Sequence, residues 1–232
     1  MKLAIMQPYL FPYIGYFQLI NAVDKFVIYD DVNYIKKGWI NRNNILVNHK
    51  ASMFTVPLTG ASQNKLIYEI ATGDLHAWSK SFLKTVEQNY KRAPYYENTF
   101  LMLKKILSAE SQHIAALCSD SLKQIADYLE LKTGFVQTSR VYNNHELKGQ
   151  ERILDICLKE NAGHYINPVG GMELYSKEKF SGNGIQLNFI KSQGVTYQQF
   201  NDEFVPWLSI IDVLMFNSPE DIKAMLHKYE LL

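Results

Sequence analysis

Two adjacent carboxylates, Asp30 and Asp31, and the polar groups that follow them are the side chains of this sequence best suited to chemistry. Lys37, Asn41 and Arg42 come within the next dozen residues. The Arg42 guanidinium is a planar fork that suits a phosphate or a carboxylate. The acidic pair suits a divalent cation held together with a diphosphate, or a general base acting on an amine. Because successive side chains of an extended chain point to opposite faces, we expect one aspartate to face a ligand and the other to hold a turn.

Aromatic side chains surround polar groups in the segment before the acidic pair. Gln7 and Tyr9 lie in a proline-bearing stretch, Tyr16 follows shortly after, and Trp39 stands among the later polar residues. Small-molecule sites are built in this way, with aromatic groups for shape and a few polar groups for direction. Trp39 suits either a stacking platform or a packed anchor. We therefore expect Gln7, Tyr9 and Tyr16 to contact a small ligand.

The run from Tyr13 to Tyr16 has the spacing of the His-x-Gly-His motif, with which one class of nucleotidyltransferases binds phosphates at a helix start. Tyrosines stand where the histidines would be. A tyrosine hydroxyl hydrogen-bonds a phosphate but supplies no imidazolium. The difference argues against adenylyl transfer and leaves two interpretations. Either a nucleotide binds here, or Gly15 only lets a helix pack closely on a sheet.

A second set of polar residues lies in the C-terminal half. Glu151 falls in the first turn of an expected helix, where a carboxylate complements the helix dipole, and Arg152 beside it either stays solvated or reaches a ligand. Asn167 ends an expected strand and precedes a glycine-bearing turn at which backbone can approach a ligand. Asp212 stands inside an apolar run, so it needs a partner. Arg42 or Arg152 would serve, in a structural role.

The elements around Gln7 and Asp30 place both residues at one edge of a sheet. Residues 2–6 read as a strand, 14–22 as a helix and 26–29 as a second strand. This order opens a βαβ unit and favours an α/β fold with a parallel sheet. Ligands bind at the carboxyl ends of the strands in such sheets. Since Gln7 and Asp30 each follow a strand end, we expect them to face the same crevice.

The remaining pattern completes a single domain over residues 1–232. Apolar residues at helical spacing predict three consecutive helices within about 76–131, forming a helical layer or inserted subdomain. A last helix should follow Ser218, with Pro219 in its first turn. Further expected elements are strands at 53–58, 135–137, 164–167 and 185–190 and a helix at 149–161. The expected fold class is α/β, with a mostly parallel, Rossmann-like sheet.

The balanced charge and the missing motifs exclude several classes of protein. With 24 basic and 23 acidic residues, the formal charge of +1 gives no field that would attract nucleic acid or an anionic membrane. No apolar run is long enough for a membrane span or a signal peptide. GxxxxGK[ST], GxGxxG, GxSxG and HExxH are absent, and the scattered histidines and two cysteines suggest no metal site. We expect a cytoplasmic protein in which Cys118 and Cys157 are core thiols.

The chain resembles the WbqC-like protein family over essentially its whole length. The N-terminal strings carry most of the specificity. The matching strings are Gln7-Pro8-Tyr9, Pro12-Tyr13-Ile14-Gly15-Tyr16-Phe17, Phe26-Val27-Ile28-Tyr29-Asp30-Asp31-Val32, Trp39-Ile40-Asn41-Arg42-Asn43, Gln150-Glu151-Arg152-Ile153-Leu154-Asp155-Ile156-Cys157, Tyr165-Ile166-Asn167-Pro168 and Leu208-Ser209-Ile210-Ile211-Asp212. Many members carry a His-Pro before a late Tyr-x-Gln, whereas residues 192–198 here lack it, so no role for that histidine carries over.

The resemblance implies a transferase of bacterial surface-polysaccharide (O-antigen) biosynthesis. It would move an acyl or aminoacyl group, glycyl among them, onto a nucleotide-linked amino sugar. Aromatic residues and asparagines would grip the sugar, Arg42 or Arg152 the diphosphate, and Asp30 or Asp31 would deprotonate the amine. The donor would be an acyl thioester, which a carrier protein could present, or an acyl-adenylate. The alternatives are a non-catalytic partner that binds a sugar or nucleotide, and a degenerate HxGH-type nucleotidyltransferase.

Overall fold

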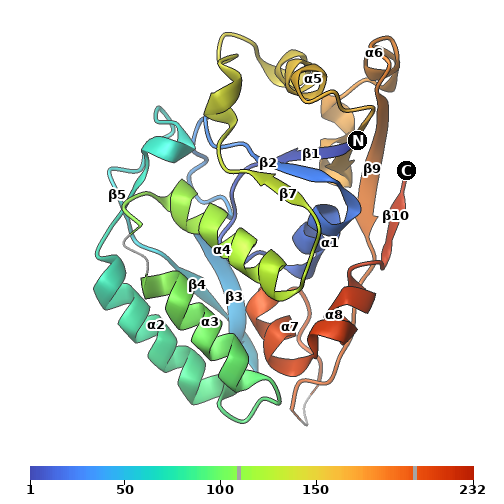
Figure 1. Ribbon diagram of the computed structural model, residues 1–232. Helices are drawn as coiled ribbons and strands as arrows, with labels where there is room; N and C mark the ends of the chain where they lie inside the picture. Colours follow the sequence, from blue (N-terminus) through green and yellow to red (C-terminus); the bar gives the residue numbers. More distant parts are fainter. Residues whose placement is uncertain (109–110, 201–202) are drawn as a thin grey trace.

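A central six-stranded sheet runs through the computed structural model, which describes residues 1–108, 111–200 and 203–232 (Figure 1). Its strands are β1 (Lys2–Met6), β2 (Lys25–Ile28), β7 (Gly134–Val136), β8 (His164–Pro168), β9 (Gln186–Ser192) and β10 (Tyr229–Leu231). They lie in the order β10-β9-β8-β1-β2-β7, and every neighbouring pair is parallel except β10 with β9. The expected α/β class with a mostly parallel sheet is therefore confirmed.

Alternate side chains of the central strands belong to two buried apolar clusters, one on each face of the sheet. In β1, Leu3 and Ile5 belong to one cluster and Ala4 to the other, because successive side chains of a strand point to opposite faces. The cluster of Leu3 and Ile5 also contains side chains of α5 (Gly149–Lys159) and α6 (Lys177–Ser181). These two helices therefore cover that face.

The opposite face packs against α1 (Ile14–Ala22), α7 (Ile210–Phe216) and α8 (Pro219–Met225). The expected cap of the last helix is present, since the Ser218 hydroxyl accepts a hydrogen bond from the Asp221 amide at 3.0 Å. Buried Gln18, in α1, donates to the carbonyls of Met225, at the end of α8, and of Lys228 beyond it, at 3.0 and 2.9 Å. The end of the chain is thus tied to its first helix.

The chain between β2 and β7 forms a large insertion, at the left and lower left of Figure 1. It holds an antiparallel hairpin of β3 (Arg42–Val47) and β4 (Lys50–Thr55). Its other elements are β5 (Leu58–Thr59), η1 (Ile67–Glu69), β6 (Ala71–Thr72), α2 (Leu75–Tyr90), α3 (Tyr96–Ser108) and α4 (Ile114–Tyr128). The three helices occupy the range in which the sequence predicts them.

The β3–β4 hairpin and β10 differ from the sequence expectation. Polar Asn43 and Asn44 interrupt the apolar pattern of β3, yet their backbone pairs in register with Phe54 and Met53. β4 ends at Thr55, before the expected limit, because the Val56 amide turns to the Asn41 carbonyl at 2.8 Å. Strand β10 lies at the sheet edge, where one neighbour is enough to hold three residues.

The strand order places a switch point between β1 and β8. The chain proceeds from β1 to β2 and β7 on one side, then returns to β8 and β9 on the other. Two further short helical turns, η2 (Ser139–Tyr142) and η3 (Val169–Leu174), follow β7 and β8 at the same carboxyl edge. Connections that leave a sheet in opposite directions open a crevice between them, and ligands bind there in open α/β sheets.

Candidate functional site

A hollow of about 670 Å³ lies over the carboxyl ends of β1, β8 and β9, and we call it the aromatic hollow. Strand β1 supplies its end and the residues after it. Strand β8 supplies Pro168 and the glycine-bearing turn that follows. Its lining residues are Met6, Gln7, Pro8, Tyr9, Tyr13, Gly15, Tyr16, Leu19, Ile35, Gly38, Trp39, Ile40, Pro168, Val169, Gly170, Ile190, Lys191, Ser192 and Trp207. The hollow therefore spans the switch point.

Aromatic rings form much of the wall of this hollow. Tyr9 contacts Tyr16 edge to face, with ring centroids 6.0 Å apart, and lies 6.5 Å from the ring of Trp39. The Tyr16 hydroxyl donates to the Gln7 carbonyl at 2.7 Å, which fixes the loop after β1. Burial raises the pKa of Tyr9, Tyr13 and Tyr16, so these hydroxyls stay neutral at physiological pH.

A few polar groups give the hollow direction. Among the described residues, the Gln7 side-chain amide and the Lys191 ammonium bond to none, so both can meet a ligand. Helix α1 begins at the same wall, and the Tyr13 side chain makes no capping hydrogen bond to it. The free amides at a helix N-terminus favour an anion. A Cβ at Gly15 would collide with the Tyr13 ring, so glycine lets this ring pack against the side of the first helical turn.

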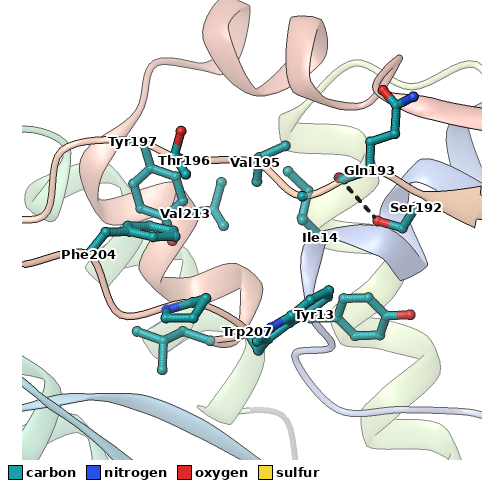
Figure 2. Close-up of a pocket in the computed structure, with 13 residues that line it drawn as sticks. Tyr13, Ile14, Ser192, Gln193, Val195, Thr196, Tyr197, Phe204, Trp207 and Val213 are labelled. Atoms are coloured by element: carbon teal, nitrogen blue, oxygen red, sulfur yellow. Dashed lines mark hydrogen bonds between the residues drawn. The ribbon is translucent and has the colours of Figure 1, made fainter.

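A second space of about 270 Å³ adjoins the hollow, and we call it the side compartment (Figure 2). The two share Tyr13, Ser192 and Trp207. The rings of Tyr13 and Trp207 meet edge to face with centroids 6.3 Å apart. Trp207 is 68% exposed and has a φ of 62°, the left-handed region that bulky residues rarely adopt. An exposed tryptophan held in a strained backbone is typical of a functional site.

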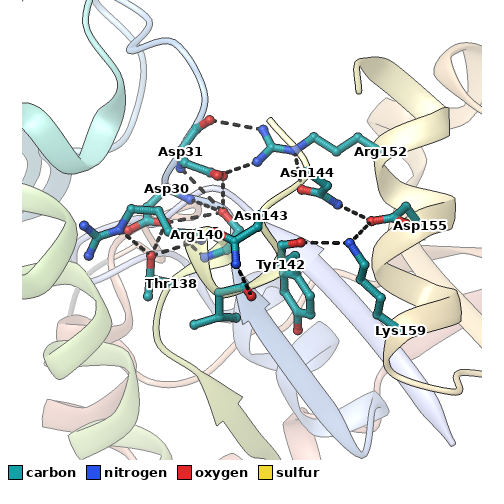
Figure 3. Close-up of polar contacts among 12 residues, drawn as sticks. Asp30, Asp31, Thr138, Arg140, Tyr142, Asn143, Asn144, Arg152, Asp155 and Lys159 are labelled. Carbon is teal, nitrogen blue, oxygen red and sulfur yellow. Dashed lines mark hydrogen bonds and ion pairs between the residues drawn. The ribbon is translucent and has the colours of Figure 1, made fainter. Parts of the chain in front are cut away.

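The acidic pair lies elsewhere, in a closed network beyond the ends of β2 and β7 (Figure 3). The Asp31 carboxylate forms a buried ion pair with Arg152 and accepts a hydrogen bond from the Ser139 hydroxyl. Arg152 also donates to the Asp31 carbonyl at 3.1 Å and to the Asn144 side chain at 2.9 Å. The Asn144 side-chain amide in turn donates to the Asp155 carboxylate at 2.6 Å. We call this set the Asp31–Arg152 network.

Asp30 faces a third hollow, of about 420 Å³, between the carboxyl ends of β2 and β7 and helix α4. Its carboxylate accepts hydrogen bonds from the Thr138 hydroxyl at 2.8 Å and the Ser139 amide at 3.1 Å. Burial raises its pKa against the effect of these donors. Gln7 and Asp30 thus line different hollows, and the expectation that they share one crevice is wrong. The donors at Thr138 and Ser139, which follow β7, hold the Asp30 carboxylate at that side of the sheet edge.

Three of the sequence-predicted ligand contacts, Gln7, Tyr9 and Tyr16, come together in the aromatic hollow. Arg42 lies beside it, with its guanidinium 5.4 Å from the centre of the Trp39 ring. Its Nε donates to the Gly38 carbonyl at 2.8 Å, and another nitrogen binds the Lys37 carbonyl. Arg42 therefore holds the turn that carries Trp39.

The other predicted ligand contacts lie outside the aromatic hollow. Lys37 is exposed, and buried Asn41 accepts from the Tyr34 hydroxyl and donates to the Val56 carbonyl. Glu151 is exposed and pairs with Lys179. Buried Asn167 donates to the Pro168 carbonyl at 3.3 Å and accepts from the Tyr165 hydroxyl at 3.2 Å. Gln7, Asp30, Arg42 and Arg152 therefore do not line one pocket.

Asp212 has partners other than the expected arginines. Its fully buried carboxylate accepts from the Tyr90 hydroxyl at 2.8 Å, the Tyr197 hydroxyl at 2.7 Å and the Gln199 amide at 2.7 Å. These donors are neutral, and burial raises the pKa of Asp212 despite them. The contacts join α2, the segment after β9 and α7, which supports the structural role but not the proposed partners.

Sequence reasoning pointed to the glycine-bearing turn after Asn167, which lines the hollow, but it missed two other contributions of the C-terminal half. Lys191 and Ser192 end β9, and Trp207 precedes α7. The rule that ligands bind at strand ends points to Lys191 and Ser192, because an expected strand ends just before them. Trp207 carries no comparable signal, since its exposure depends on a backbone turn that the sequence does not show.

No metal cluster or membrane helix is present within residues 1–108, 111–200 and 203–232. No three His, Cys, Asp or Glu side chains there gather as metal ligands. None of the helices there is long and apolar enough to cross a membrane. Both cysteines are buried and unpaired, and burial raises their pKa.

Comparison with known proteins identifies a family and a relative of this chain. The sequence model of the WbqC-like protein family matches residues 7–224. A protein of Mycobacterium tuberculosis (strain ATCC 25618 / H37Rv), named "Uncharacterized protein Rv1507c", is 29% identical over 222 residues, which are 93% of each chain. No solved structure matches the chain.

Proposed function

The chain belongs to the WbqC-like protein family, and from this premise we propose that it binds a nucleotide-linked amino sugar in the aromatic hollow. We further propose that it is a cytoplasmic transferase of bacterial surface-polysaccharide (O-antigen) biosynthesis, which moves an acyl or aminoacyl group onto the sugar amine. The observation that carries the proposal is the position of an aromatic-walled hollow at the switch point of a parallel sheet.

The strand order supports nucleotide binding. Numbered along the chain, the five parallel strands lie in the order 3-2-1-4-5, counted from β7 to β9, with β10 antiparallel at the end. This is the order of doubly wound, Rossmann-like sheets, in which nucleotides bind at the crevice beside the first strand. The aromatic hollow occupies the corresponding place in this chain.

The wall chemistry supports a phosphorylated and ring-bearing ligand. The start of α1 and the Lys191 ammonium can meet a diphosphate. Tyr9 and Trp39 offer ring faces to a base or a sugar, and the Gln7 amide can bond a hydroxyl or a base edge.

In the transfer step, the amine nitrogen of the sugar attacks the carbonyl carbon of an acyl thioester or an acyl-adenylate. The new C–N bond forms as the C–S or C–O bond breaks, and the amine proton passes to water. The leaving group departs as AMP, or as a thiolate that takes a proton back from water. No carboxylate or imidazole occurs among the described residues that line the hollow. We therefore propose that Asp30 and Asp31 support the fold and that solvent takes up the amine proton. A carrier protein is the proposed source of a thioester donor.

Thermal unfolding in the presence of UDP-, GDP- and dTDP-linked amino sugars tests the binding. At least one should raise the Tm, and Lys191→Ala should weaken that binding most at low salt, while Lys84→Ala on α2 should not. Incubation of the bound sugar with acyl-CoA and aminoacyl-adenylate donors should then give the N-acylated product, detected by mass spectrometry. The absence of any Tm shift with all three nucleotide classes would contradict the proposal.

A non-catalytic binding partner is the second candidate. It is favoured by the same lining, which brings no carboxylate or imidazole to the hollow among the described residues. It predicts a raised Tm with a nucleotide-linked sugar and no product with any donor.

A further inference from the structure

The side compartment presents mainly apolar surface to a ligand, and its polar side chains, Tyr13, Ser192, Gln193, Thr196 and Tyr197, are uncharged. Ile14, Val195, Phe204, Leu208 and Val213 contribute apolar surface to it. Figure 2 shows Val195, Phe204 and Val213 around the same space. No charged side chain occurs among the described residues that line it. An ionic group that entered would lose its hydration without gaining a counter-charge.

The buried Asp212 carboxylate does not supply a counter-charge to the side compartment. Tyr197 lines the compartment, and its hydroxyl turns away to donate to Asp212 at 2.7 Å. Tyr90 and Gln199 occupy the rest of that carboxylate, which is fully buried. Asp212 therefore offers no exposed charge to a ligand ammonium.

The compartment and the aromatic hollow share a wall. Tyr13, Ser192 and Trp207 line both spaces. Of these three residues, Ser192 is the one with an aliphatic hydroxyl. The exposed Trp207 ring stands at the boundary with Tyr13, with centroids 6.3 Å apart. Both spaces are open to solvent, so one ligand can extend past this boundary from the larger space into the smaller.

We infer that the side compartment binds an uncharged aliphatic acyl chain of several carbons, carried by the ligand whose nucleotide-linked part lies in the aromatic hollow. This inference rests on the proposed function and narrows it to acyl transfer. An aminoacyl group such as glycyl would bring its ammonium into a space without a counter-charge. The amide of the product, formed as described above, would lie near Ser192.

Titration with UDP-glucosamine and its N-acetyl, N-butanoyl and N-hexanoyl derivatives tests whether the side compartment binds an acyl chain. Each added methylene should tighten binding by up to about fourfold while the compartment fills. Val195→Phe should fill the compartment and make the N-acetyl and N-hexanoyl derivatives bind alike. Val141→Phe, an identical change at an exposed site in η2, should preserve the chain-length dependence.

Free acetamide, butanamide and hexanamide, titrated by NMR, separate this inference from the proposed function. These probes need no nucleotide sugar. Hexanamide should bind the wild type more tightly than the shorter amides, and Val195→Phe but not Val141→Phe should weaken its binding; this result supports the inference. If no UDP sugar binds, that failure counts against the proposed function and not against the acyl-chain site. Equal binding of all three amides overturns the inference, as does an N-acyl series without chain-length dependence when UDP-glucosamine itself binds.

Discussion

The two halves of the carboxyl edge of the sheet have opposite characters. Beyond β2 and β7, Asp31, Arg152 and Asn144 bond to one another and are buried. Beyond β1, β8 and β9, tyrosine and tryptophan rings surround an open hollow of about 670 Å³. The Asp31–Arg152 network is closed and only Asp30 of the acidic pair faces a hollow, whereas the half with the fewest charges presents an open aromatic wall to a ligand.

Charged residues near strand ends therefore need not face a ligand. A buried charge requires a partner, and where the fold supplies that partner the pair becomes part of the framework. Neutral rings and amides can stay unbonded at a surface without such a cost. An open wall is therefore more readily built from aromatic residues than from ionic ones.

Asp31→Ala, which breaks the Asp31–Arg152 network, should have the largest effect. The change leaves Arg152 buried without its carboxylate, so the free energy of unfolding should fall by about 3–5 kcal/mol. Urea denaturation measures the loss, with exposed Asp127→Ala as the control. The double change Asp31→Leu with Arg152→Met should recover much of the stability. Unchanged stability with lost ligand binding would instead place Asp31 in the site.

Trp39→Ala tests the open half. Trp39 is 50% exposed and contacts Tyr9, so we expect a loss of about 1–3 kcal/mol in the affinity for a nucleotide-linked sugar, as for other rings that stack on bases. Isothermal titration calorimetry measures it. Trp78→Ala, which removes a ring stacked on Phe82 in α2, should show the reverse pattern, lower stability with unchanged affinity.

Asp212→Asn tests the buried carboxylate beside the side compartment. Burial raises its folded-state pKa above the unfolded value of about 3.9. Folding therefore favours the protonated form, so its contribution is fully present below about pH 3.9 and is lost as pH rises through the folded-state pKa. The stability of the wild type minus that of the variant should fall in this range by up to about 1.4 kcal/mol per pH unit, then level off. Urea unfolding between pH 4 and 8 measures it, and a difference that grows with pH would contradict the assignment.

Glu151→Gln should have the smallest effect. Glu151 and Lys179 form an exposed ion pair, 53% and 38% accessible, and such pairs contribute less than about 1 kcal/mol. Thermal unfolding should show a small shift that Lys179→Gln reproduces. A loss as large as that of Asp31→Ala would mean that Glu151 belongs to the buried network.

The elements that open the chain could be predicted because local signals agree there. β1 and α1 match the expected limits, and β2 lies one residue earlier than expected. The prolines at 8 and 12 exclude a helix between β1 and α1. The β3–β4 hairpin has no such signal, since Asn43 in its first strand satisfies its side chain through the Phe11 carbonyl, 32 residues away.

The site could be predicted only in part. Gln7, Tyr9 and Tyr16 lie close in sequence and share the hollow. The pairing of Asp31 with Arg152 spans 121 residues, and two ionic side chains look the same in a sequence whether they bind each other or a ligand. The Trp207 backbone also escapes prediction, because a positive φ at tryptophan is set by its surroundings and opposes its own preference.

The insertion between β2 and β7 also affects how the chain emerges during synthesis. Lys25 pairs with Gly134, so 109 positions separate partners in adjacent strands. At about 5–20 residues per second, β7 reaches the ribosome exit about 5–20 s after β2. During that interval the outer edge of β2 has no β7 to pair with, and an open strand edge is a template for association between chains. Folding of the hairpin and three helices of the insertion before β7 arrives would shorten the loop to be closed and shield this edge of the nascent chain.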